Sequence, residues 1–133
     1  MNKFVSVIIP VLDNIVGLRK TLFALDNQIY DARYEVIVVD NGSTQDLTAV
    51  VSEFARAKLI YEQRPGSYIA RNKGISIARG EILAFTDSDC IPAFDWLAKG
   101  VEQLLSVENC GLVAGKIDFF YQNPQQLYAF SLP

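Results

Sequence analysis

Histidine is absent from the sequence. A histidine general base, a histidine-activated nucleophile and a histidine zinc ligand are therefore excluded for this chain, which leaves acid–base chemistry to carboxylates, lysine and tyrosine. Cysteine is scarce: Cys90 and Cys110 show no C-x-x-C spacing, so neither a zinc site nor a redox site is indicated. Two isolated cysteines are typical of a reducing compartment, and we predict a cytoplasmic location.

Long uncharged apolar runs are missing as well. No segment approaches the ~18 apolar residues that a membrane-spanning helix needs, so we expect no membrane segment in this chain. The apolar run after Lys3 is similar to the start of a signal peptide, but Pro10 and Asp13 interrupt it and no cleavage site of small residues follows. The formal net charge of −3 argues against binding of a nucleic-acid polymer.

Short β-branched apolar runs alternate with segments in which leucine recurs at helical spacing. Half of the residues are hydrophobic, so we expect residues 1–133 to form a single domain with its own core. The alternation predicts an α/β fold, a three-layer sandwich with a mostly parallel sheet and helices on both faces. The predicted strands are 4–9, 35–39, 58–62, 81–85 and 110–121, and the predicted helices are 15–28, 43–55, 68–79 and 93–107.

The ends of these elements carry recognisable signals. Pro10 is expected to end the first strand because proline has no N–H to donate to a sheet. Ser43 or Thr44 is expected to cap the second helix and Ser67 the third. Gly80 fits the left-handed residue that commonly closes a helix. No element is predicted for the tail from residue 122 onward.

Aspartates follow three of the predicted strands. Asp13 comes after the first strand, Asp40 ends the second, and Asp87 and Asp89 come after the fourth. Ligands of parallel sheets bind outside the carboxyl ends of the strands, so we expect these acids to converge on one edge. Asp13 and Asp40 also have a purely structural explanation, because aspartate commonly accepts hydrogen bonds from N–H groups where a helix begins.

The pair Asp87 and Asp89 is harder to explain as capping, since a cap needs one acceptor. Two carboxylates within ~6 Å raise each other's pKa unless a cation neutralises them. Oxygen ligands without histidine or paired cysteine favour Mg²⁺ or Mn²⁺, and such ions bind one or two carboxylates together with substrate phosphates. Asp87 and Asp89 are therefore the predicted metal ligands, and a nucleoside diphosphate is the predicted ligand class.

Positive charge gathers between residues 64 and 79, a segment that contains no acid. Lys73 and Arg79 are expected on a solvated helix face. Arg71 lies in the first turn of its predicted helix, where N–H groups attract anions, and an arginine there can hold a phosphate or a base carbonyl. Asp40, on a neighbouring strand, could accept a hydrogen bond from a pyrimidine imide or a ribose hydroxyl.

Four segments, "SVIIPVLDN", "YEVIVVDNGSTQD", "ARNKGISIARGEILAFTDSD" and "PAFDWL", occur in an order and spacing that resemble the family 2 nucleotide-sugar glycosyltransferases. The resemblance spans about residues 5–98. It implies the A-type glycosyltransferase fold, a Rossmann-like nucleotide-diphospho-sugar transferase fold. It also implies a metal-dependent hexosyltransferase that uses Mn²⁺ or Mg²⁺ and a nucleotide-sugar, typically a UDP-sugar. A role in cell-envelope polysaccharide synthesis would follow from the same resemblance.

The resemblance assigns roles to individual residues. Asp40 would recognise the base, often uracil, and Arg71 would assist on the nucleotide side. Asp87 would lie near the ribose or a metal-bound water, and Asp89 would ligate the metal. Asn41 stands where the family often has a second aspartate, which lowers the weight of that position. The residues that would bind the nucleotide-sugar are Pro10, Val11, Leu12, Asp13, Asp40, Arg71, Asp87, Ser88 and Asp89.

No catalytic base can be assigned from the sequence. In the family, a carboxylate that deprotonates the acceptor for inverting transfer lies beyond the D-x-D strand, in a second half of comparable size. Asp118 is a possible acid, but nothing identifies it as the base. We therefore expect the chain to be the donor-binding half of a longer enzyme, with the acceptor site, and any contact with the inner face of a membrane, in parts outside it.

Two other functions stay open. A nucleotidyltransferase also uses acids and a metal on a similar sheet, but the loop after the first strand lacks the glycines and basic residues that commonly hold a triphosphate there. A non-catalytic module that binds a nucleotide, or only supports a partner protein, would equally explain the missing base.

Overall fold

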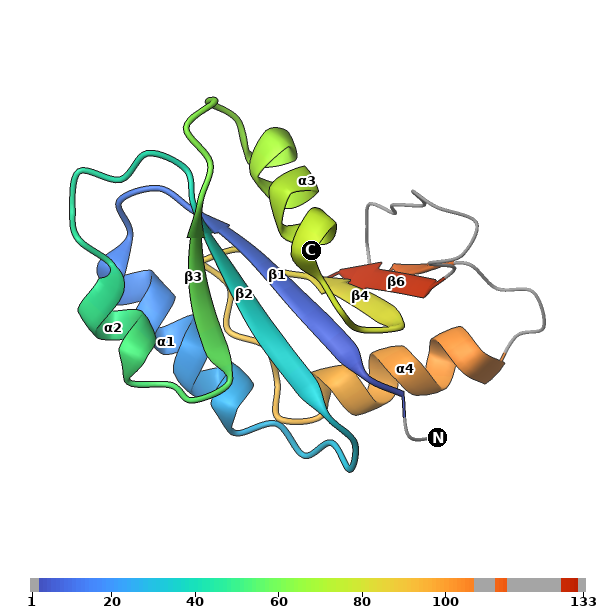
Figure 1. Ribbon diagram of the computed structural model, residues 1–133. Coiled ribbons are helices and arrows are strands. Elements are labelled where there is room, and N and C mark those ends of the chain that lie inside the picture. The colour runs from blue at the N-terminus through green and yellow to red at the C-terminus, as the bar shows by residue number, and fades with distance from the viewer. Residues whose placement is uncertain (1–2, 107–111, 115–127, 132–133) are drawn as a thin grey trace.

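The computed structural model describes residues 3–106, 112–114 and 128–131, which form a six-stranded sheet with helices on both faces (Figure 1). The strand order is β3-β2-β1-β4-β6-β5, and every pairing is parallel. No helix within the described ranges is long and apolar enough to cross a membrane. The elements are β1 (Val5–Val11), α1 (Ile15–Asp26), β2 (Tyr34–Asp40), α2 (Thr48–Ser52), β3 (Ala57–Tyr61), α3 (Ser67–Ile77), β4 (Ile82–Phe85), α4 (Trp96–Ser106), β5 (Leu112–Ala114) and β6 (Tyr128–Ser131).

Two apolar layers hold the helices to the sheet. On one face, alternate residues of β1 such as Val7 and Ile9 pack with Leu18 and Leu22 of α1 and with residues of α2 and α4. On the other face, residues including Ile8 pack beneath α3. The helices lie accordingly in Figure 1, with α3 alone on its side. Strands buried on both faces are expected to be continuously apolar, and the predicted three-layer α/β fold is confirmed.

Pro10 does not end the first strand, because β1 continues to Val11. The Ile8 carbonyl accepts a hydrogen bond from the Thr86 N–H, on the β4 side. Strand alternation turns the Pro10 nitrogen to that same side, beyond Phe85, where β4 has ended. The missing N–H of proline therefore interrupts no pairing within the sheet, and the prediction was wrong because it ignored which side the nitrogen faces.

The predicted cap of the second helix was also wrong. Neither Ser43 nor Thr44 caps it: α2 begins at Thr48, after Leu47. Both side chains contact Asp13 instead. The Asp13 N–H donates to Ser43 Oγ over 2.9 Å, and Thr44 Oγ1 donates to Asp13 Oδ1 over 3.0 Å. The two polar side chains that follow β2 therefore form hydrogen bonds with the loop after β1, and α2 begins later than predicted.

Glycine, not serine, precedes α3. Gly66 is the N-cap, with a φ of 121° that favours glycine, and Ser67 is the first helical residue. Gly80 does not have the predicted left-handed conformation. Its smallness matters for another reason, since an added Cβ would lie 2.6 Å from the backbone nitrogen of Ser6. The loop after α3 therefore runs directly against β1.

The carboxyl-terminal part of the sheet is described only in short pieces. Leu112–Ala114 is a strand inside the predicted range 110–121, and the rest of that range, including Asp118, lies outside the described residues. The tail, for which no element was predicted, contributes β6 between β4 and β5.

Glu35 joins several elements at the amino end of the sheet. Its side chain is only 7% exposed, and it accepts hydrogen bonds from Ser6 Oγ (2.6 Å) and the Arg79 N–H (2.9 Å) and lies 3.2 Å from Lys58 Nζ. Burial opposes its ionisation, but the hydrogen bonds from Ser6 and Arg79 and the charge of Lys58 outweigh burial and lower its pKa. Glu35 thereby links β1, β2, β3 and the loop before β4.

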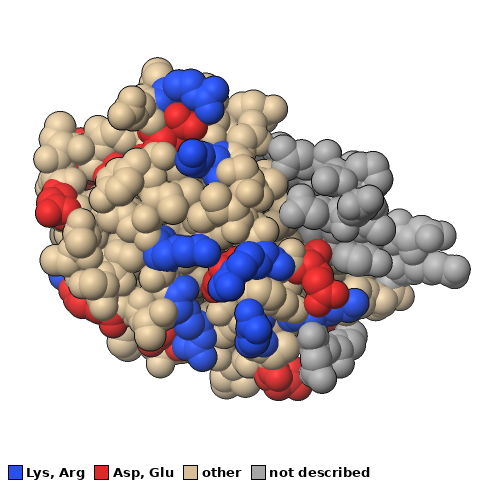
Figure 2. Space-filling model, viewed as in Figure 1, with Lys and Arg blue, Asp and Glu red and all other residues tan. Residues whose placement is uncertain are grey.

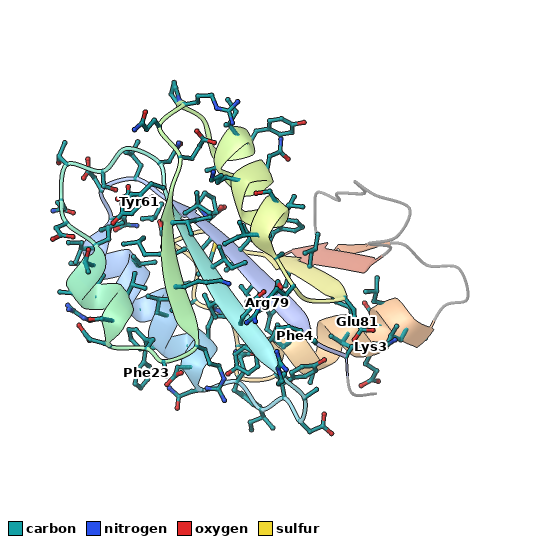
Figure 3. All side chains as sticks on the ribbon, in the orientation of Figure 1. Lys3, Phe4, Phe23, Tyr61, Arg79 and Glu81 are labelled. Atoms are coloured by element: carbon teal, nitrogen blue, oxygen red, sulfur yellow. The ribbon has the colours of Figure 1, made fainter. Side chains whose placement is uncertain are left out.

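Arg79 contributes more than the solvated position that was predicted for it. Its guanidinium lies 3.3 Å from Glu35 Oε1 and 5.8 Å from the centre of the Phe4 ring, although 65% of the side chain is exposed. Figure 3 shows Arg79 and Phe4 at this end of the sheet. In the same orientation, Figure 2 shows that several basic side chains gather on the face of the molecule turned toward the viewer. Arg79 therefore belongs to the buried Glu35 network through both its backbone N–H and its guanidinium.

Glu35→Gln should lower the free energy of unfolding by about 1–3 kcal/mol, because a buried charge-assisted network loses its charge. The matched control is Glu81→Gln, at an ion pair with Lys3 in which the Glu81 side chain is 55% exposed. The control should lose less than about 1 kcal/mol. Urea denaturation followed by circular dichroism measures both. Equal losses in the two variants would contradict the role given to Glu35.

Candidate functional site

The strand order reverses between β1 and β4. From β1 the sheet extends through β2 to β3, and the chain then returns to place β4 on the other side of β1 (Figure 1). Loops leaving the carboxyl ends of neighbouring parallel strands diverge at such a point and leave a crevice where ligands bind. Of the acids singled out from the sequence, Asp13 follows β1, Asp40 ends β2, and Asp87 and Asp89 follow β4, while Asp118 lies outside the described residues.

Asp13 has a left-handed backbone, with a φ of 51°. Its Oδ1 accepts hydrogen bonds from the N–H groups of Thr44 (2.6 Å) and Gln45 (3.0 Å). The backbone hydrogen bond from Gln45, together with the hydrogen bonds from Thr44, outweighs the opposing effect of burial and lowers the pKa of Asp13. Asp13 therefore orders the loop after β2, while α1 is capped by Asn14, which accepts from the Gly17 N–H.

Asp40 ends β2 directly beside Val11 of β1. It is 6% exposed, and its Oδ1 accepts a hydrogen bond from the Ser43 N–H over 2.8 Å. Pro10 and Val11 are buried within β1, whereas the side chain of Leu12 is 58% exposed at the edge. The described hydrogen bonds and ion pairs do not join Asp13 or Asp40 directly to the acids after β4.

Asn41 has a structural role that the sequence did not indicate. Its Nδ2 donates to the carbonyls of Glu62 (3.0 Å) and Arg64 (2.8 Å), and its Oδ1 accepts from the Gly66 N–H (3.1 Å). An aspartate could not donate the first two hydrogen bonds. Asn41 thus attaches the end of β2 to the loop before α3. An amide in place of the family's aspartate is the sequence signal that could have indicated this role.

Glu62 and Arg64 close the same loop. The buried Glu62 carboxylate accepts from the Arg64 N–H (3.1 Å) and from its guanidinium, with Nη2 at 2.9 Å. These side-chain and backbone hydrogen bonds lower the pKa of Glu62 to about 2. The negative charge of Glu62 is thereby matched within the loop.

Arg71 of α3 and Asp87, after β4, form an ion pair at this edge. Arg71 Nη2 lies 3.0 Å from Asp87 Oδ1, with side-chain exposures of 30% and 45%. The sequence placed the two residues at one site but did not pair them. The pairing means that part of the repulsion between Asp87 and Asp89 is offset by a cation of the chain itself.

The segment after β4 turns tightly. The Cys90 N–H donates to the Asp87 carbonyl over 3.1 Å, with Ser88 and Asp89 at the corner. Ser88 is buried and Asp89 is exposed. One ligand atom each from Asp87, Asp89 and Cys90 lie within 4.8 Å of one another. The turn therefore presents two carboxylates to one point, as a shared cation requires.

The thiol of Cys90 lies beside these acids. Burial, together with the charges of Asp89 and Asp87, raises the pKa of this thiol, and a soft sulfur ligand suits a hard cation less well than a carboxylate does. The donor set offered by the turn is therefore the two carboxylates. Such oxygen donors fit a hard divalent cation, Mg²⁺ or Mn²⁺, better than zinc.

Two buried side-chain oxygens lack a hydrogen-bond partner among the described residues. They are Asn72 Oδ1 and Thr86 Oγ1. Each belongs to the residue next to a member of the Arg71–Asp87 ion pair. Unpaired buried polar atoms are rare and call for an explanation, and a ligand or ordered water at this edge would supply one.

The fold and this edge define a class of protein, the parallel α/β domains that bind a ligand at the strand-order reversal, here with paired acids beside an arginine. Within that class, the chain belongs to glycosyl transferase family 2, whose family model matches residues 6–130. The resemblance drawn from the motifs is confirmed.

The sequence relatives are longer proteins. The chain is 43% identical over 126 residues to glycosyltransferase AglE of Haloferax volcanii, covering 90% of this chain and 41% of the relative. It is 37% identical over 123 residues to the uncharacterized glycosyltransferase YfnE of Bacillus subtilis, covering 87% of this chain and 31% of the relative. The chain thus spans less than half the length of either protein.

Solved structures share the fold. Mannosyltransferase PcManGT from Pyrobaculum calidifontis, in complex with GDP-Man and Mn²⁺, matches with a TM-score of 0.77 and 31% identity, over 86% of this chain and 35% of that one. Glucosyl-3-phosphoglycerate synthase from Mycobacterium tuberculosis, in complex with Mn²⁺, UDP and glucosyl-3-phosphoglycerate, matches with a TM-score of 0.72 and 25% identity, over 90% and 44%. The predicted A-type glycosyltransferase fold is confirmed.

Glu62→Gln should make the stability of the protein less dependent on pH in the acidic range. The pKa of Glu62 is lowered to about 2 from a usual 4.5, so its stabilising effect is complete above the usual value and is lost as pH falls toward about 2. The melting temperature of the wild type should exceed that of the variant at neutral pH, and the difference should shrink between about pH 5 and about pH 2.5. The control, Glu102→Gln at an exposed position of α4, should show no such change. A difference that is constant with pH would contradict the pairing.

Proposed function

We propose that this chain is the donor-binding part of a glycosyltransferase and binds a nucleotide-sugar together with a divalent metal ion at the carboxyl edge between β1 and β4. The observation that carries the proposal is the turn after β4, which directs Asp87 and Asp89 to one point beside Arg71. Membership of family 2, and neighbours solved with Mn²⁺ and either GDP-Man or UDP, support it.

Asp89 and Asp87 would hold the metal, Mn²⁺ or Mg²⁺. Asp89 is exposed, and the hydrogen bond recorded for its carboxylate is a long one from the Cys90 thiol, 3.7 Å. Asp87 Oδ1 is already engaged by Arg71, so Asp87 has less freedom and would bind through its other oxygen or through a water. When bound, such a metal supplies Lewis-acid stabilisation of the charge that develops on the departing nucleoside diphosphate.

The nucleoside would lie toward β1 and β2. The described hydrogen bonds of the Asp40 side chain engage Oδ1, which leaves Oδ2 to accept from a base imide. Asp13 would contribute through its loop, because its carboxylate already orders residues 44 and 45. The segment from Pro10 to Leu12 would form the wall of the pocket, with Ser88 at its back. UDP remains the predicted nucleotide, with GDP as the alternative.

Transfer itself belongs to the whole protein. The relatives extend well beyond the matched region, and Asp118, a possible acid, lies outside the described residues. We therefore propose that the catalytic base, the acceptor site and the residues that determine the inverting stereochemistry lie in parts of the protein outside this chain. A cytoplasmic location likewise stays a prediction.

Calorimetric titration with UDP, and separately with GDP, in the presence and absence of Mn²⁺ tests this function. One nucleotide should bind more tightly with Mn²⁺. The double variant Asp87→Ala, Asp89→Ala should weaken that metal-dependent binding by about tenfold or more, because the first ligands are lost. Asp26→Ala, Asp31→Ala removes the same charge elsewhere and should bind as the wild type does. Nucleotide binding that does not depend on Mn²⁺, or that is unchanged in the double variant Asp87→Ala, Asp89→Ala, would overturn the proposal.

A further inference from the structure

Three polar residues spaced seven apart along the first helix hold the segment that follows β4. Asn14 precedes α1, Thr21 lies within it, and Gln28 follows it. Seven residues are close to two helical turns, so such positions lie on one side of a helix. All three side chains make hydrogen bonds to residues between 88 and 97, a segment far away in the sequence.

Thr21 is the central contact and is fully buried. Its Oγ1 lies 2.6 Å from the Cys90 carbonyl, 3.1 Å from the Ser88 carbonyl and 3.0 Å from the Gly17 carbonyl. A hydroxyl has one proton to donate, and the shortest distance marks the Cys90 carbonyl as its main acceptor. Ser88 and Cys90 flank Asp89, so Thr21 contacts the backbone on both sides of the proposed metal ligand.

Gly17 makes the close approach possible. A Cβ at this position would lie 2.6 Å from the Ser88 carbonyl oxygen and would also meet the Asn14 side chain. Asn14 Nδ2 lies 3.5 Å from both the carbonyl and Oγ of Ser88. The corner of the turn is therefore seated directly on the first turn of α1.

Gln28 secures the far end of the segment. Its Nε2 donates to the Ala93 carbonyl over 2.6 Å, and its Oε1 accepts from the Leu97 N–H over 3.0 Å. The Ile29 N–H adds a hydrogen bond to the Phe94 carbonyl, 2.8 Å. The segment from the turn after β4 (the metal turn, Asp87–Cys90) to the start of α4 is thus held by Asn14, by α1 and by the residues that directly follow α1.

These contacts share a property that ordinary packing lacks: they engage mainly the backbone of the segment. The side chain of Asp89 is left exposed while the atoms on either side of it are fixed. Fixing the backbone around a ligand limits the positions that its carboxylate can take, in the way that outer partners orient metal ligands elsewhere.

We propose that Thr21 is a positioning residue for the metal site and orients Asp89 through the Ser88 and Cys90 carbonyls. Gly17 allows this contact because it has no side chain to keep the Ser88 carbonyl away from α1. This inference rests on the proposed function, because it presumes that Asp87 and Asp89 bind a metal. It assigns no contact between Thr21 and the metal.

The test compares three variants of the full chain. Thr21→Val removes the hydroxyl and keeps the shape, Thr21→Ser keeps the hydroxyl, and Tyr34→Phe is the matched control. Tyr34 also donates a buried hydroxyl hydrogen bond to a backbone carbonyl, that of Leu25, away from the metal turn. Mn²⁺ affinity is measured by electron paramagnetic resonance with saturating UDP or GDP, and amide hydrogen exchange is measured without metal.

Thr21→Val should weaken Mn²⁺ binding by about tenfold, at the lower end of the effect of losing an outer partner of a metal ligand. In the same variant, the rate of amide hydrogen exchange measured without metal should rise in residues 88–97. Thr21→Ser should bind within about threefold of the wild type, and Tyr34→Phe should bind as the wild type does even if its melting temperature falls equally. A purely structural role predicts that the affinities of Thr21→Val and Tyr34→Phe match, and that result would overturn the inference.

Gly17→Ala decides the matter if Thr21→Val does not fold. The added methyl group would push the Ser88 carbonyl away while the Thr21 hydroxyl stays, and Mn²⁺ binding should again weaken by about tenfold. Unchanged affinity in Gly17→Ala would overturn the inference. A wild-type chain that binds no Mn²⁺ with either nucleotide would show, before any variant is made, that the proposed function has failed and the inference with it.

Discussion

The parallel pairing of β1 with both β2 and β4 is the constraint on which the rest of the structure depends. It brings Val11 beside Asp40 and Ile8 beside Phe85, so chain segments that are far apart in the sequence leave the sheet at the same edge. The helices on the two faces supply the apolar burial that makes this arrangement stable, and Glu35 joins the strands again at the opposite end. The sheet thus determines where the site lies, and the segments that leave its carboxyl edge supply the side chains.

Charge at that edge is distributed unevenly. Backbone N–H groups engage Asp13 and Asp40, and Arg64 and Arg71 engage Glu62 and Asp87. Each of these four acids thus has a close hydrogen-bond or ion-pair partner within the described residues. Asp89 differs in being exposed, with one long contact from a thiol. Asp89 is therefore the acid most available to a cation, with Asp87, whose Oδ1 is engaged by Arg71, as the second carboxylate of the turn.

Much of this could be predicted from sequence, and the failures have physical causes. Apolar runs and leucine spacing identify most strands and helices, and the acids after the strands indicate the edge, because both signals are local. The partners of Asp13 lie 31 and 32 residues away and those of Thr21 up to 69, so capping rules applied to neighbours assign them wrongly or overlook them. Pro10 was misjudged because its effect depends on which strand lies beside its nitrogen.

The central claim is that one edge of the sheet binds a metal together with a nucleotide. Paramagnetic broadening of backbone amide signals by Mn²⁺, in the presence of the nucleotide that binds, tests it most directly. The account predicts that signals around Asp87 to Cys90 broaden first, followed by those near Asp13 and Arg71, while signals near Glu35 at the opposite end stay sharp. Broadening centred anywhere else, or spread evenly over the acidic surface, would contradict it.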